Sequence, residues 1–119
     1  MATQIVYTSG SGRIRGLLRD CNQTLVTQAD VTGIKLNIFE YSMGQYTPVP
    51  GYSNATIPTS AILDTPATDC EGNRFNFDTD PDDGVHPPFP NRNMTYIVEV
   101  ILTSTNGTKS VHQLEAFSK

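Results

Sequence analysis

Residues 94–117 read MTYIVEVILTSTNGTKSVHQLEAF, two alternating segments joined by an Asn-Gly turn. In residues 94–103 every second side chain is apolar, and a period of two is the spacing of one face of a β-strand. The pair Asn106-Gly107 favours the primed turns whose twist matches two antiparallel strands. The stretch therefore predicts a β-hairpin, in which residues 109–117 form the returning strand.

Both faces of the first hairpin strand carry apolar residues. One face consists of Tyr96, Val98, Val100 and Leu102. The other face carries Ile97 and Ile101, which indicates that the strand is covered on both sides, by the chain itself or by a neighbouring subunit.

The same alternation recurs upstream, most clearly in residues 33–41. Here Ile34, Leu36 and Ile38 are predicted to point inward. Further strands are predicted for residues 12–20 and 74–78. Thr27–Asp30 has the form of a capping motif and predicts one short helical turn.

These patterns predict an all-β, immunoglobulin-like antiparallel β-sandwich, with a small open β-barrel as the alternative. Short strands, frequent turn residues and no ten-residue helical period support this fold class. A chain of 119 residues has the size of one domain. We expect that domain to span residues 12–119, preceded by an N-terminal arm over residues 1–11.

Charge and hydropathy exclude two classes of partner. The formal net charge is −4, with 8 basic against 12 acidic residues, so the clustered basic surface that nucleic acids require is missing. Arg13, Arg15 and Arg19 alternate, as on the solvated face of one strand. No apolar segment has a length close to the about 18 residues that a membrane span needs. Because residues 1–11 lack the features of a signal peptide, we expect a protein made in the cytoplasm.

The sequence contains no catalytic motif and no cofactor fingerprint, so we expect a protein that is not an enzyme and binds no cofactor. One acidic segment, residues 78–84, contains weak calcium candidates in Asp78, Asp80 and Asp82. Its glycine and its twelfth position do not match an EF-hand loop, and a solvated acidic loop is the favoured interpretation.

The two cysteines, Cys21 and Cys70, lie in similar polar turns. A disulfide between them would close a loop of about 50 residues and contribute about 4 kcal/mol. Spacing alone does not show pairing, and two free thiols are favoured because no secretion signal is present.

Two segments rich in proline and aromatic residues, 41–52 and 85–90, are the candidate protein interface. We call them the two loops. Tyrosine and methionine are enriched in interface centres, and proline reduces the entropy lost on binding. The alternative is that both loops fold back over the ends of the sandwich. The arm could also add a strand to a neighbour's sheet or pair within its own chain. The interface candidates are Tyr41, Met43, Tyr46, Val49, Tyr52, Val85 and Phe89 in the loops, and Ile5, Val6 and Tyr7 in the arm.

Three segments carry a resemblance to a known class of protein: residues 14–20, 25–31 and 34–39, together with the final Asn-Gly hairpin. In its pattern of strands and turns the chain resembles small all-β accessory proteins of tailed-bacteriophage virions, which decorate or cement capsids or serve in tails and necks. The resemblance implies a virion location, a dimer or trimer, contacts with a major capsid or tail protein, and no catalytic residue. The alternative function is a ligand- or carbohydrate-binding, adhesin-like module, for which three aromatic rings in one flat row would be expected.

Overall fold

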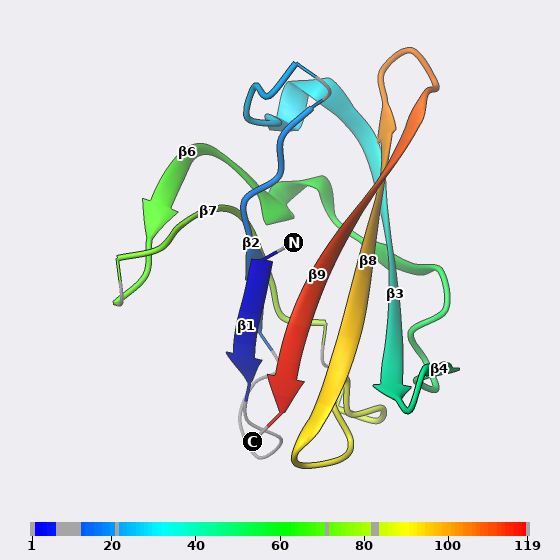
Figure 1. The fold of residues 1–119 in the computed structure, drawn as a ribbon. Helices are drawn as coiled ribbons and strands as arrows, with labels where there is room; N and C mark the ends of the chain where they lie inside the picture. The colour runs from blue at the N-terminus through cyan, green and yellow to red at the C-terminus, as the bar shows by residue number, and fades with distance from the viewer. Residues whose placement is uncertain (1, 7–12, 21, 71, 82–83, 119) are drawn as a thin grey trace.

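A computed structural model of the chain describes residues 2–6, 13–20, 22–70, 72–81 and 84–118. These residues form two packed β-sheets, which is the predicted immunoglobulin-like sandwich (Figure 1). Among the described strands none pairs with both sheets, so the open-barrel alternative is not adopted. Within these ranges, no helix has the length and apolar character needed to cross a membrane.

The large sheet has the strand order β1-β9-β8-β3-β4, and β5 also pairs with β3. All of its pairings are antiparallel except that of β1 with β9. The strands are β1 (Ala2–Val6), β3 (Val31–Ser42), β4 (Gln45–Pro48), β5 (Ala55–Ile57), β8 (Met94–Ser104) and β9 (Lys109–Ser118).

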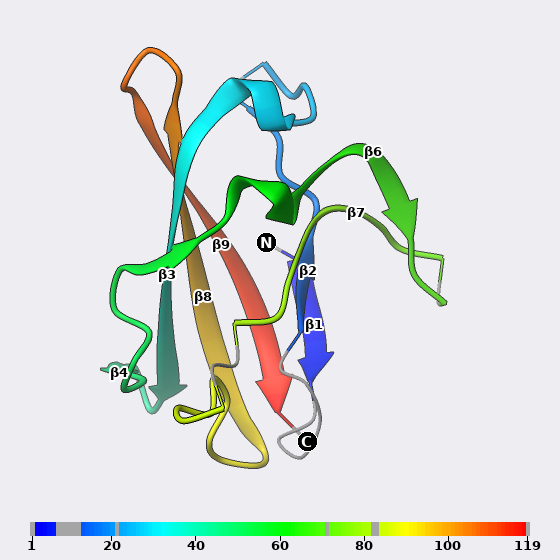
Figure 2. The ribbon, with the colours of Figure 1, turned by 180° about the vertical axis from the view of Figure 1, so that it is seen from behind.

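The small sheet has the order β2-β7-β6 and lies behind the large sheet, as the reverse view shows (Figure 2). Its strands are β2 (Ile14–Gly16), β6 (Ile62–Thr68) and β7 (Arg74–Thr79). In both views the β6–β7 hairpin extends sideways beyond the large sheet. Two short 3-10 turns, η1 (Gln28–Asp30) and η2 (Thr59–Ala61), precede β3 and β6.

The core lies between the two sheets, and the alternation seen in the sequence determines which side chains enter it. The residues predicted to point inward from β3 and from the main face of β8 are all buried. They pack against apolar side chains of β2, β6 and β7 and of the segment after β2. The core includes Ile34, Leu36, Ile38, Tyr96, Val98, Val100, Leu102, Ile14, Leu18, Ile62 and Phe77.

The predicted hairpin is confirmed, but its turn differs from the expected two-residue primed turn. Ser104 N–H donates to Thr108 O at 2.8 Å, which closes a three-residue loop. Only Gly107 within this loop has a positive φ, of 88°. A type I turn followed by one left-handed residue therefore connects the strands, and glycine adopts that conformation without steric cost.

The predicted strand over residues 12–20 is shorter in the structure, because β2 ends at Gly16. Beyond it the buried side chain of Asn76 replaces a strand partner. Its Oδ1 accepts the Leu18 N–H at 2.6 Å, and its Nδ2 donates to Leu18 O at 2.9 Å and to Val26 O at 3.1 Å. One side-chain amide thus satisfies backbone groups that a longer strand would have paired.

The short helical turn is confirmed as η1, where Asp30 Oδ2 accepts the Thr27 N–H at 3.1 Å. Within the expected N-terminal arm, Ile5 and Val6 lie in β1, which pairs in parallel with β9 of the same chain. Of the two alternatives for this segment, the structure therefore has pairing within the chain. Tyr7 lies outside the described residues.

Candidate functional site

The outer face of the large sheet carries a cluster of large apolar side chains. In an antiparallel sheet, the face that does not contact the core is normally polar. Register places Phe39 of β3 beside Ile97 of β8, and Tyr41 of β3 beside Tyr46 of β4. We call these four residues, Phe39, Tyr41, Tyr46 and Ile97, the aromatic cluster.

Ring contacts hold the aromatic cluster together. The ring centroids of Tyr41 and Tyr46 lie 4.9 Å apart with an interplanar angle of 52°, and those of Phe39 and Tyr46 lie 6.4 Å apart at 86°. Such tilted and edge-to-face pairs are the favoured geometries of aromatic rings. Ile97 is only 8% exposed, whereas Ile101, the other apolar residue on this face of β8, is half-buried.

A shallow depression adjoins the aromatic cluster. It has a volume of about 310 Å³ and is lined by Phe39, Tyr46 and Ile97 together with the polar residues Glu99 and Gln113. Glu99 and Gln113 are opposite each other on β8 and β9, one rung from Ile97. The depression therefore combines an apolar floor, an aromatic wall, a carboxylate and an amide.

The loop candidates for the interface divide into two groups. Met43 is 98% exposed, Tyr46 60% and Val85 76%, and Tyr41 is also exposed. These four residues are available for contact, although Val85 lies in the loop between β7 and β8 and belongs to no strand of the sheet.

For the other loop candidates, the prediction of an exposed interface is wrong. Val49, Tyr52 and Phe89 are buried in the core, so both loops fold back over the sandwich in part. The Tyr52 hydroxyl donates to His86 O at 2.5 Å and links the two loops, while the Phe89 ring packs edge-on against Tyr96 with centroids 5.2 Å apart. Each loop thus buries part of its apolar side chains and leaves the others exposed.

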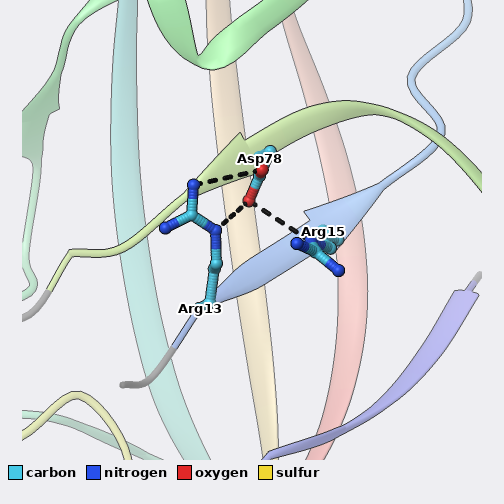
Figure 3. A network of polar contacts seen from close by, with 3 residues as sticks. All are labelled: Arg13, Arg15 and Asp78. Atoms are coloured by element: carbon cyan, nitrogen blue, oxygen red, sulfur yellow. Dashed lines mark hydrogen bonds and ion pairs between the residues drawn. The ribbon is translucent and has the colours of Figure 1, made fainter. Parts of the chain in front are cut away.

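A polar cluster lies on the small sheet, where two arginines contact one carboxylate (Figure 3). Arg13 Nε lies 2.6 Å and Arg15 Nε 3.5 Å from Asp78 Oδ1. The hydrogen bond to Asp78 raises the pKa of Arg13. These contacts join β2 to β7 across a paired rung of the sheet.

The same contacts bear on the calcium candidates. The carboxylate of Asp78 is engaged by cations, Asp80 is exposed, and Asp82 lies outside the described residues. In the ranges that the structure describes, no group of three or more potential ligands is placed to hold a metal ion. The acidic segment therefore serves in part as an ion-pair partner of β2.

The cysteine turns are alike in geometry. Asp20 Oδ1 accepts the Thr24 N–H at 2.9 Å, and Asp69 Oδ1 accepts the Asn73 N–H at 2.9 Å. Cys70 is a free, exposed thiol in the turn of the β6–β7 hairpin. Cys21 itself lies outside the described residues.

Sequence reasoning identified the tyrosines of the aromatic cluster but missed Phe39, Glu99 and Gln113. Their signal was present: Phe39 continues the outward face of the 33–41 strand, opposite its inward-pointing residues. What the sequence could not supply is the register that places Glu99 and Gln113 in one row.

No family model, curated protein or solved structure matches the chain. The function is therefore argued from the chain's own geometry and sequence.

Proposed function

We propose that the chain is a non-enzymatic structural protein of a virion, which decorates or cements a capsid by docking through the outer face of its large sheet. The observation that carries the docking role is the aromatic cluster, in which the Tyr41 and Tyr46 rings contact each other and are both exposed. Met43, in the turn that joins their two strands, is also exposed. Contiguous apolar surface of this kind marks interaction sites on soluble proteins. The virion location rests on the resemblance of the strand and turn pattern to phage accessory proteins.

The rigidity of the surface supports docking. Three of the four residues of the aromatic cluster lie on β3 and β8, the two strands paired along most of their length. Side chains that are already fixed by sheet pairing and ring packing lose little entropy when a partner covers them. Tyrosine and methionine are also among the residues enriched at the centres of protein interfaces.

The ring orientations weigh against the carbohydrate-binding alternative. Sugar stacking requires aromatic rings that present their faces in one flat row. The rings of Tyr41 and Tyr46 are tilted by 52°, and those of Phe39 and Tyr46 are nearly perpendicular. Such an arrangement offers edges and faces in different directions, which suits the irregular surface of a protein partner.

Gradient sedimentation tests the proposal. The chain would be produced together with the capsid and tail proteins encoded in the same genome, and assembled particles would be separated from free protein. We expect the wild-type chain in the particle fractions and the double variant Tyr41→Ser/Tyr46→Ser at the top of the gradient.

Val111→Ser is the matched control, because Val111 is an exposed apolar residue on the same sheet that does not belong to the aromatic cluster. This variant should sediment with the particles. A wild-type chain that stays at the top would contradict the virion role, and a double variant that sediments like wild type would contradict the docking surface.

A further inference from the structure

The depression beside the aromatic cluster has a carboxylate without a cation. In the part of the chain that the structure describes, no lysine or arginine forms an ion pair with Glu99. Glu99 Oε1 accepts instead a hydrogen bond from the Asn37 side-chain amide, at 3.5 Å. Lys35, which precedes Asn37 on the same face of β3, donates instead to Thr56 Oγ1 at 2.6 Å. The carboxylate beside the rings is therefore open to a cation from outside.

On the small sheet, an arginine contacts both an aromatic ring and a carboxylate. The guanidinium carbon of Arg15 lies 4.6 Å from the centroid of the Phe75 ring. Arg15 Nε also lies 3.5 Å from Asp78 Oδ1, a contact drawn in Figure 3. A ring face and a carboxylate together stabilise a guanidinium through cation–π attraction and a charged hydrogen bond. At the depression, Tyr46 and Phe39 supply the rings and Glu99 supplies the carboxylate.

We infer that the depression binds an arginine side chain presented by the docking partner. This inference rests on the proposed function and names the chemistry of the partner at the same surface. Arginine fits better than lysine because its planar, weakly hydrated guanidinium stacks on rings and bonds to carboxylate and amide oxygens at once. Gln113 provides that amide oxygen at the rim.

Charge favours a basic partner over a second copy of the chain. The net charge of −4 makes two copies repel each other and attracts a positively charged surface. In addition, three arginines are engaged within the chain: Arg13 and Arg15 with Asp78, and Arg19 with Gln23 O at 2.9 Å.

Titration of the whole chain with short peptides, followed by NMR, tests the inference. The probe is a blocked Gly-Arg-Gly tripeptide, and its control is the citrulline tripeptide, which has the same shape without the charge. We expect the arginine peptide to shift the signals of Tyr46, Ile97 and Gln113, with citrulline binding about two- to fivefold more weakly.

Two charge-removing variants sharpen the test. Glu99→Gln should weaken arginine binding by about two- to fivefold. Glu115→Gln should leave it unchanged, because Glu115 lies beside Ile97 on the same face but does not line the depression. Equal binding of the two peptides, equal losses in the two variants, or shifts of these signals with protein concentration alone would each overturn the inference.

The sedimentation assay separates this inference from the docking role. If Glu99→Gln joins the particles as completely as wild type while Tyr41→Ser/Tyr46→Ser does not, the arginine site is wrong and the docking surface stands. If both variants sediment like wild type, both proposals fail.

Discussion

The buried side-chain amide of Asn76, on β7, bonds to the backbone at Leu18 and at Val26. Replacing Asn76 with alanine leaves the Leu18 N–H and the Val26 carbonyl without their side-chain partner, whereas Leu18 O still accepts the Val26 N–H at 3.1 Å. Two buried, unsatisfied groups predict a loss of about 2–4 kcal/mol in the free energy of unfolding. Urea denaturation would measure the loss.

The control for that prediction is Asn22→Ala. Asn22 is exposed, and its backbone N–H, not its side chain, bonds to Asp20. This variant should change stability by less than about 0.5 kcal/mol. Similar losses in the two variants would show that Asn76 does not have the proposed structural role.

Tyr96 makes the stability of the fold depend on alkaline pH. Its hydroxyl accepts the Asn91 N–H at 2.8 Å and donates to Glu40 Oε2 at 3.0 Å. Burial, followed by the contacts with Glu40, raises the pKa of Tyr96 from 10.0 to about 12. Between these pH values the unfolded chain releases this proton while the folded chain retains it, so the free energy of unfolding falls as pH rises through this range.

Tyr96→Phe should remove that pH dependence. The variant is expected to be less stable than wild type at pH 8, because it loses two hydrogen bonds, and to decline less steeply above pH 10. Guanidinium unfolding at a series of pH values compares the two proteins. Parallel declines would contradict the assignment to Tyr96.

At the scale of elements, β2 packs directly on β9 at Gly16. An added Cβ at this position would lie 2.8 Å from Leu114 Cδ2, closer than carbon atoms approach in folded proteins. Gly16→Ala should therefore push the sheets apart or displace Leu114, at a cost of about 1–3 kcal/mol. Thermal unfolding followed by circular dichroism would detect this as a lower Tm.

Gly33 on β3 is the matched control, since an added Cβ there meets nothing within 4 Å. Gly33→Ala should leave the Tm unchanged or raise it slightly, because alanine reduces the freedom of the unfolded chain. Equal destabilisation by both variants would mean that the close approach of the two sheets at Gly16 is not the cause.

The elements that the sequence predicted best are those whose register is set by alternation alone. The strand over 33–41 and the 94–117 hairpin are confirmed because each has one continuous apolar face to bury. The 12–20 strand was overestimated because Asn76, distant in sequence, takes over its backbone groups at Leu18. Composition predicted that loop residues such as Phe89 would be exposed, but only the folded chain shows that Tyr96 packs against that ring.

At the scale of the whole molecule, the two outer faces have different chemistry. The small sheet presents an internally paired cluster of arginines and Asp78, whereas the large sheet presents the aromatic cluster and an acid without a cation among the described residues. The cluster on the small sheet is thus paired within the chain, whereas the acid on the large sheet, Glu99, is open to a partner. This difference suits the proposed docking in one orientation. Of the tyrosines predicted from sequence, Tyr41 and Tyr46 lie on the outer face of the large sheet, but the depression beside them emerged only from the pairing of β3, β8 and β9.

The proposed docking role requires that Tyr41 and Tyr46 contribute little to the stability of the fold. The most direct measurement is the free energy of unfolding of Tyr41→Ser/Tyr46→Ser, by guanidinium titration. Since both side chains are exposed, we expect the free energy of unfolding of the variant to lie within about 1 kcal/mol of that of wild type. A loss of more than about 3 kcal/mol, the scale of a core truncation, would show that the cluster belongs to the core and would contradict the claim.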